Sequence, residues 1–364
     1  MWPTLRSFAA TVRNDDPKSL PGERYGRVRT GVVSRTAYGG SGYESRIVLA
    51  MIVTVTPNPS FDRTMQTESF EIGLVNRATG VTVEGSGKGI NVSRALALSG
   101  VQSTCVFPSK ADDAARMAEH SDDVSGFTWH SVDTGTSVRT NITVIDKDGR
   151  TTKINEPGDT FASAQQEQLL DAVAEVGRNA EWLVGCGSLP PGMSTDFYRQ
   201  LAERGRSAGV KMAIDASGAA LAEAVEGNAS LIKPNRDELA SVVGRELLTL
   251  GDVVDAALEV RDGGVGGVVV SLGSSGAVLI DETGVVHGVA PTNDVRNTVG
   301  AGDGFLAGFL AGGGVGPDAL ASALAFGRAA VQSPSTAFPP ATDDDRAAVT
   351  LTEDIDRNLP VGHE

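Results

Sequence analysis

Short β-rich runs alternate with helical patterns along most of this 364-residue chain, starting at Met51, and no other feature limits its fold as strongly. The helical pattern over residues 164–176 is an example, because Leu169, Val173 and Val176 recur there at helical spacing. Strands joined by helices normally pair in parallel, and such a sheet needs cover on both faces. The sequence therefore predicts an α/β fold, a three-layer α/β/α domain with a mostly parallel sheet. The β-rich runs lie at residues 51–56, 105–107, 182–186, 210–214, 230–233 and 267–272.

One stretch, residues 127–155, breaks this alternation. It holds β-rich runs at 127–130, 137–145 and 151–154 with no helical pattern between them. The last two runs flank Asp146-Lys147-Asp148-Gly149, a strong hairpin signal because glycine tolerates a positive φ. We expect a small antiparallel β flap here. It is either decoration of the domain or a lid over an active site.

Composition excludes several classes of protein. The formal net charge of -15 argues against a nucleic-acid-binding surface, which needs excess Lys and Arg to neutralise phosphates. No run approaches the ~18 apolar residues that a membrane-spanning helix needs. Two cysteines, Cys105 and Cys186, do not make a disulfide framework. We therefore expect a reduced, cytoplasmic protein with no nucleic-acid or membrane partner.

The first fifty residues differ from the rest, with eight Lys and Arg against four Asp and Glu. They lack an apolar core followed by a small-residue cleavage site, so they do not match a secretory signal. We expect residues 1–50 to be a disordered extension or the product of a start codon assigned too early; a regulatory or targeting arm is the alternative. Residues 51–342 would form the main domain, and residues 343–364 a C-terminal helix and tail that begins at the acidic Asp343-Asp344-Asp345.

The strongest local signal is Gly300-Ala301-Gly302-Asp303, which precedes the apolar run at 305–310. Glycines that lead into a helix let its first N–H groups approach an anion closely, and the helix end carries a positive partial charge. The Asp303 carboxylate could accept a proton from a hydroxyl held beside that anion. Phosphoryl transfer to an alcohol needs this combination. The alternative is a helix that Asp303 merely caps.

Two standard nucleotide motifs are missing. A P-loop through Gly87-Lys88 would need a glycine at position 82 and Ser or Thr at position 89, but the chain has Thr82 and Gly89. No G-x-G-x-x-G follows the first strand with an acidic residue about 20 positions on, which weakens a dinucleotide-binding interpretation.

A second glycine-rich turn, residues 85–89, enters a helical pattern. Lys88 and Asn91 fall in its first turn, on the side that faces whatever the loop cradles. A cation and an amide there suit a sugar phosphate, whereas Lys88 alone would be an ordinary surface lysine.

Two further segments follow predicted strands. Asn235 and Glu238, after Lys233-Pro234, have a simple interpretation as a capping box and a functional one as groups that organise Mg²⁺ and its waters. The loop at residues 271–277 contains Gly273 and Gly276, which permit close approach of a ligand but also suit an ordinary hairpin turn.

Together these residues resemble the ribokinase-like PfkB carbohydrate kinase family, over residues 51–338 and in the family's order. No single motif is decisive, but eight in sequence order are very specific. They are Thr56-Pro57-Asn58-Pro59-Ser60-Phe61-Asp62, Gly87-Lys88-Gly89-Ile90-Asn91, Arg139-Thr140-Asn141, Asn155-Glu156-Pro157-Gly158, Gly187-Ser188-Leu189-Pro190-Pro191-Gly192, Lys233-Pro234-Asn235, Ser271-Leu272-Gly273 and Gly300-Ala301-Gly302-Asp303.

The resemblance implies an ATP- and Mg²⁺-dependent sugar-phosphate kinase of ribokinase-like fold, in which residues 127–155 contribute most of a β lid that pairs in a homodimer. Asp303 is then the general base, and Gly300, Ala301 and Gly302 form the anion hole. The sugar phosphate would be bound by Asp62, Gly87, Lys88, Asn91 and Arg139. The nucleotide would be bound by Lys233, Ser271, Gly273, Gly276 and Thr298, and Mg²⁺ by Asn235 and Glu238 through water.

Fructose 1-phosphate is the leading substrate, with tagatose 6-phosphate and fructose 6-phosphate as alternatives. The non-enzymatic alternative is a sugar-phosphate sensor that binds its ligand without turnover. The chain departs from the family after Val106-Phe107-Pro108, where a glycine pair usually leads into a helix. Here Ser109-Lys110-Ala111-Asp112-Asp113 follows, and then the polar residues 120–123. The departure concerns the sugar-side loops and leaves the phosphoryl-transfer motifs intact.

Overall fold

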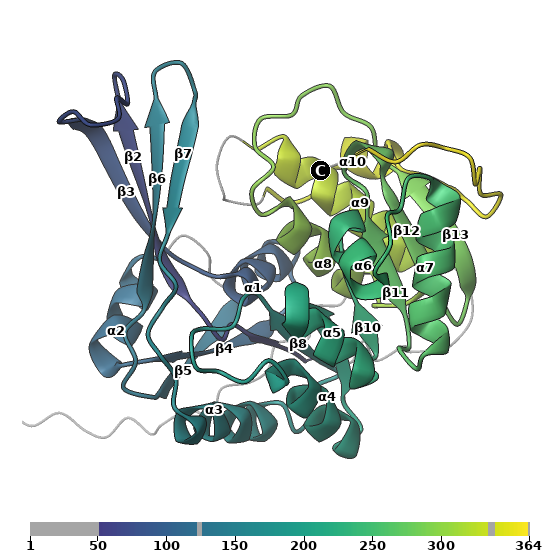
Figure 1. Cartoon of the computed structure of the whole chain (residues 1–364), viewed down its shortest axis with the longest axis horizontal. Helices are drawn as coiled ribbons and strands as arrows, with labels where there is room; N and C mark the ends of the chain where they lie inside the picture. Colours follow the sequence, from purple (N-terminus) through teal and green to yellow (C-terminus); the bar gives the residue numbers. More distant parts are fainter. Residues whose placement is uncertain (1–50, 122–125, 334–338, 363–364) are drawn as a thin grey trace, which may run out of the picture. The chain divides into compact units, whose positions relative to one another are not determined.

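The computed structural model describes residues 51–121, 126–333 and 339–362 (Figure 1). The expectation about residues 1–50 therefore lies outside the described residues. Within them, no helix combines the length and apolar character that crossing a membrane requires.

The main sheet has ten strands, in the order β14-β13-β12-β11-β10-β9-β8-β1-β4-β5. The seven neighbouring strands β11, β10, β9, β8, β1, β4 and β5 pair in parallel, whereas β12, β13 and β14 pair antiparallel. The predicted mostly parallel sheet is thus confirmed. The strands are β1 (Ile52–Val55), β4 (Ser103–Ser109), β5 (Phe127–Asp133), β8 (Trp182–Cys186), β9 (Lys211–Asp215), β10 (Leu231–Ile232), β11 (Val268–Ser271), β12 (Ala277–Asp281), β13 (Gly284–Val289) and β14 (Thr350–Thr352).

Helices cover both faces of this sheet. Successive residues of a strand point to opposite faces, so each face carries apolar side chains that need cover. In β8, Leu183 packs into one apolar cluster, and Trp182 and Val184 pack into the other. The first cluster contains residues of α3 (Ser163–Val176), α4 (Phe197–Ser207), α5 (Gly218–Glu226), α6 (Arg236–Val243) and α7 (Leu250–Asp262). The second contains residues of α1 (Lys88–Leu98), α8 (Ala301–Ala311) and α9 (Gly316–Val331). The three-layer α/β/α prediction is therefore confirmed.

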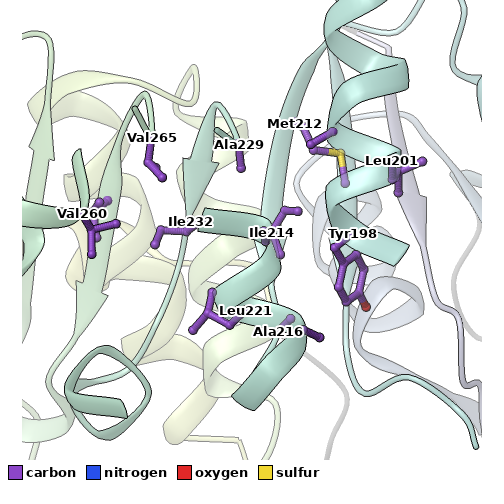
Figure 2. Packing of buried hydrophobic residues seen from close by; sticks show 14 of the residues in the cluster. Tyr198, Leu201, Met212, Ile214, Ala216, Leu221, Ala229, Ile232, Val260 and Val265 are labelled. Carbon is purple, nitrogen blue, oxygen red and sulfur yellow. The ribbon is translucent and has the colours of Figure 1, made fainter. Parts of the chain in front are cut away.

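Figure 2 shows part of the first cluster, where α4 packs beside β9. Tyr198 and Leu201 of α4 lie near Met212 of β9, and all three are almost completely buried. A Cβ atom at Gly185 of β8 would come within 2.7 Å of the Tyr198 ring. The glycine is thus needed so that this ring can lie against the sheet.

A separate four-stranded sheet has the order β3-β2-β6-β7, and Figure 1 shows its strands side by side. Its strands are β2 (Ser60–Thr67), β3 (Ala78–Ser86), β6 (Arg139–Asp146) and β7 (Thr151–Asn155). The expected β6–β7 hairpin is present, but β2 pairs with β6 in parallel, and half of the sheet comes from residues 60–86. The contribution of β2 and β3 was not predicted from the sequence.

The range 127–155 is divided between the two sheets, which corrects its assignment as one lid segment. Its first strand, β5, pairs in parallel with β4 at the edge of the main sheet. The connection between them contains α2 (Ala111–Glu119), so β4-α2-β5 is a crossover unit of the main domain. Trp129 of β5 packs edge-on against Phe107 of β4, with ring centroids 5.5 Å apart, and this apolar contact holds β5 there.

Residues 343–362 are joined to the main domain and do not form a separate tail. The predicted helix start is confirmed, since α10 (Asp343–Ala347) begins with a capping box between Thr342 and Asp345. The chain then adds β14 to the main sheet, and Leu359 accepts a backbone hydrogen bond from Leu250 of α7. The described residues belong to one compact unit.

Candidate active site

The candidate site residues gather at the carboxyl ends of the parallel strands, where ligands bind in open α/β sheets. The glycine-rich turn packs against the end of β1. A Cβ atom at Gly89 would lie 2.6 Å from Thr56 Oγ1, and one at Gly87, where φ is 145°, would lie 2.5 Å from Thr56 Cγ2. Only glycine fits at both positions. The turn therefore delivers Lys88, the first residue of α1, directly to this edge of the sheet.

Asp303 lies in the first turn of α8 and is almost completely buried. The helix begins after Gly300, whose φ of 82° is left-handed and favours glycine. Asn91 Nδ2 of α1 donates a hydrogen bond to Asp303 Oδ2 at 2.9 Å, so the two predicted motifs meet. Burial raises the pKa of Asp303 to about 6, although the nearby Lys88 ammonium limits the rise. A carboxylate with such a pKa suits proton transfer near neutral pH.

The sequence analysis missed Asp215, the last residue of β9. Its carboxylate bridges two predicted site residues, with Lys88 Nζ 3.0 Å from Oδ1 and Lys233 Nζ 3.2 Å from Oδ2. Burial alone would raise the pKa of Asp215, but the two ammonium groups outweigh it and hold that pKa below its usual value. The available signal was an acidic residue at the end of a buried strand, which is unusual unless it is paired.

Lys233 is buried and points toward the start of α8. A Cβ atom at Gly302 would lie 3.4 Å from Lys233 Nζ, so this ammonium group adjoins the predicted anion hole. Asp215 raises the pKa of Lys88 against the opposing effect of burial, and Asp303 and Glu238 add to the rise. Two ammonium groups and two carboxylates thus form one charged cluster beside the helix N-terminus.

Two of the predicted sugar-side residues, Asp62 and Arg139, lie on the small sheet. Asn141 of β6 donates a hydrogen bond to Asp62 of β2 at 3.0 Å, and Ser60 donates to the same carboxylate oxygen at 2.8 Å. Arg139 begins β6 and is partly buried, and its Nη1 donates to the Glu156 carbonyl at 2.8 Å. Asp62, Arg139 and Asn141 share one face of the small sheet by their register.

Asn235 and Glu238 form the capping box that the sequence allowed. Glu238 N donates to Asn235 Oδ1 at 2.8 Å, and Asn235 N donates to Glu238 Oε2 at 2.9 Å. Among the described residues, no group of three His, Cys, Asp or Glu side chains could hold a metal ion. These residues fit Mg²⁺ only in its common mode, with one carboxylate acting through water while substrate phosphates supply other ligands.

The remaining predicted nucleotide residues lie in two loops. Ser271, at the end of β11, forms a parallel bridge with Asn235, and Gly273 begins the short 3₁₀ helix η1 (Gly273–Ser275). Position 276 requires glycine for a structural reason, because a Cβ atom there would lie 2.0 Å from the Gly288 carbonyl oxygen. Thr298 is exposed, and its carbonyl accepts a hydrogen bond from Ala301.

The fold and this site define a ribokinase-like sugar kinase, a phosphotransferase. The model of the pfkB family carbohydrate kinases matches residues 56–343, and the chain belongs to that family. The resemblance found in the sequence is thereby confirmed.

Several relatives are named 1-phosphofructokinase. The one from Rhodobacter capsulatus is 33% identical and covers 73% of this chain and 85% of its own. The one from Haloferax volcanii is 36% identical and covers 72% of this chain and 83% of its own. The solved structure of Escherichia coli phosphofructokinase-2 in complex with fructose-6-phosphate has a TM-score of 0.72 and 30% identity, and covers 82% of this chain and 98% of its own.

Proposed function

We propose that this kinase transfers the γ-phosphate of ATP to the free primary hydroxyl of fructose 1-phosphate, giving fructose 1,6-bisphosphate. The observation that carries the proposal is the buried Asp303 carboxylate at the start of α8, held by Asn91 and with a pKa raised to about 6. The names of the 1-phosphofructokinase relatives support this substrate. Fructose 6-phosphate is the second candidate, because a similar structure holds it.

In this proposal Asp303 is the general base. Its carboxylate accepts the proton of the substrate hydroxyl as the hydroxyl oxygen attacks the γ-phosphorus. A new O–P bond forms, the bond from the γ-phosphorus to the bridging β–γ oxygen breaks, and ADP leaves. The backbone N–H groups of Gly300, Ala301 and Gly302, with the N-terminal end of the α8 dipole, stabilise the charge on the transferred phosphoryl group.

The charged cluster supports a two-phosphate site. Lys233 adjoins the anion hole and would meet the nucleotide phosphates, together with Ser271, Gly273, Gly276 and Thr298 from the two neighbouring loops. Mg²⁺ on these phosphates neutralises part of their charge when it is bound. Asn235 and Glu238 would hold that ion through water.

On the sugar side, Asp62 would accept hydrogen bonds from the sugar hydroxyls, and Asn91 would donate hydrogen bonds to them. Gly87 would let the backbone approach the sugar closely. Lys88 and Arg139 would hold the phosphate already on the substrate. Arg139 suits this task because its planar guanidinium can pair with a phosphate in two places. Its buried Nε has no hydrogen-bond partner among the described residues, which leaves hydrogen-bonding capacity unused.

A homodimer through the small sheet is part of the proposal. Met65, Val81, Val83, Ile142, Val144 and Ile154 share the face opposite to Asp62. Val81 is 48% exposed and Ile154 56% exposed. An apolar sheet face of this kind is stabilised when another apolar surface covers it, and a second copy would supply an identical one. Both cysteines are free and buried, which fits the proposed cytoplasmic location.

A coupled ADP-release assay under Mg-ATP tests the substrate. We expect the highest kcat/KM with fructose 1-phosphate, compared with fructose 6-phosphate, tagatose 6-phosphate and free fructose. A preference for fructose 6-phosphate would replace the leading candidate with the second. Calorimetric binding of these sugars without turnover of any would favour the sensor and contradict the kinase.

A further inference from the structure

The backbone on both sides of Arg139 is held by carboxylates. Ser137 and Val138 precede β6, and Thr140 is its second residue. Ser137 N donates to Asp159 Oδ2 at 2.7 Å, and Val138 N donates to Asp113 Oδ2 at 2.9 Å. Thr140 N donates to Glu156 Oε2 at 2.7 Å. Hydrogen bonds to an ionised acceptor are shorter and stronger than neutral ones, so these three fix the start of β6 firmly.

The three carboxylates come from two parts of the chain. Asp113 lies in the first turn of α2, whereas Asp159 and Glu156 lie in the loop after β7. Glu156 also holds the Arg139 side chain itself, through its carbonyl oxygen. Asp113, Asp159 and Glu156 therefore hold the backbone before and after Arg139, and we refer to them as the carboxylate frame.

Asp113 is the buried member of the frame, with 3% exposure. Arg116 Nη1 lies 3.2 Å from Asp113 Oδ1, and Lys110 Nζ lies 3.6 Å from Oδ2. Lys110 also donates from its backbone to the Thr136 carbonyl at 2.7 Å and from Nζ to Ser137 Oγ at 3.1 Å. Lys110 and Asp113 both belong to residues 109–113, the segment that departs from the family's pattern. Through these two residues, the segment attaches α2 to the start of β6.

We propose that Asp113, Asp159 and Glu156 are positioning residues that hold Arg139 toward the phosphate already on the sugar substrate. This inference rests on the proposed role of Arg139. No atom of the carboxylate frame contacts the reacting groups. The frame fixes the backbone from which the guanidinium extends, so its loss lets Arg139 move and weakens sugar-phosphate binding, while the nucleotide side at β10 and β11 is unaffected.

Steady-state kinetics of Asp113→Ala provide the first test. We expect the KM for the sugar phosphate to rise about tenfold, because one charge-assisted hydrogen bond is lost. The KM for ATP and kcat should stay within about twofold of the unaltered protein. Asp113→Asn retains an acceptor for the Val138 N–H and should restore most of the loss. The matched control is Asp112→Asn, an exposed carboxylate on the same helical turn, which should change neither KM.

Asp113 is buried, so its alanine variant can lose stability for other reasons. Asp159→Ala and Glu156→Ala alter exposed side chains and should give the same selective rise in the KM for the sugar phosphate with an unchanged Tm. Equal rises in both KM values for all three variants would indicate a general structural role and overturn the inference.

A double-mutant cycle separates this inference from the proposed function. In an Arg139→Ala background, Asp159→Ala should add less than about twofold to the KM for the sugar phosphate, because the group that it positions is gone. If Arg139→Ala leaves that KM unchanged, the proposed role of Arg139 is wrong. If Arg139→Ala raises it while the frame variants do not, the frame inference is wrong and the role of Arg139 stands.

Discussion

Asn91 of α1 donates a 2.9 Å hydrogen bond to Asp303 of α8 and so joins the glycine-rich turn to the anion-hole helix across 212 residues. The bond leaves one Asp303 oxygen, Oδ1, for a substrate hydroxyl. It also fixes the carboxylate, which is what a general base requires before substrate arrives.

Asp303→Asn should reduce kcat by at least about a thousandfold, because an amide cannot accept the hydroxyl proton. The KM values should change little, since the amide fills the same volume and can still accept the Asn91 hydrogen bond. Single-turnover assays with fructose 1-phosphate check the rate, and calorimetry checks binding. A variant with near-normal kcat would remove Asp303 as the base.

The pH dependence of kcat/KM should report the same carboxylate in the free enzyme. With the pKa of Asp303 raised to about 6, kcat/KM should fall roughly tenfold per pH unit below that value, as the base becomes protonated. A pH–rate profile that stays flat from pH 7 to pH 4.5 would contradict the assignment.

The same pKa predicts a stability effect with a defined sign. The folded state disfavours the ionised Asp303, so above pH 6 the carboxylate lowers the free energy of unfolding. Asp303→Asn should raise that free energy by about 2 kcal/mol at pH 7.5. The gain should shrink as the pH falls from 6 to 4, where the buried acid is protonated. Urea unfolding at several pH values measures it, and a gain that is independent of pH would be evidence against burial as the cause.

Asp215→Asn should destabilise the protein. It removes the shared counter-ion of Lys88 and Lys233, and leaves the buried Lys233 ammonium group beside the partly exposed one of Lys88. We expect a loss of about 3 kcal/mol in the free energy of unfolding at pH 7.5. Glu226→Gln, an exposed carboxylate on α5, is the control and should have no effect. Unchanged stability of Asp215→Asn would mean that the three charges are not coupled.

If the proposed homodimer forms through the small sheet, Ile154→Lys should shift it to a monomer, because it places a charge on the exposed apolar face. Lys153→Ser alters the neighbouring residue on the opposite face and should leave the dimer intact. Sedimentation velocity distinguishes the two states. A dimer that persists in Ile154→Lys would place its interface elsewhere.

A variant that begins at Met51 should retain the kcat and KM values of the full chain, because the family match begins at residue 56. The kinetic assay and a Tm measurement check this. An unfolded or inactive truncation would contradict the interpretation of residues 1–50 as an extension.

Local sequence patterns identified the alternating elements and the order of the motifs, because strand and helix periodicity and glycine-rich turns are properties of neighbouring residues. They could not assign β5 to the main sheet or recruit β2 and β3 into the small one. The β-rich run at 127–130 would suit either sheet. Its place depends on Phe107 beside Trp129, a contact between strands that α2 separates in the sequence.

From its sequence alone, this chain is recognisable as an α/β sugar kinase, and an anion-binding turn is predicted at Gly300–Asp303. The tertiary structure decided which charged groups surround that turn and the pKa of its carboxyl group. Asp215 is an ordinary aspartate in the sequence, and it becomes the counter-ion of Lys88 and Lys233 only because the ends of β9, β10 and α1 meet at one edge of the sheet. Likewise, Asp303 acquires a pKa near neutrality only through burial. Burial and charge pairing depend on which residues surround a side chain in space, and no local pattern contains that information.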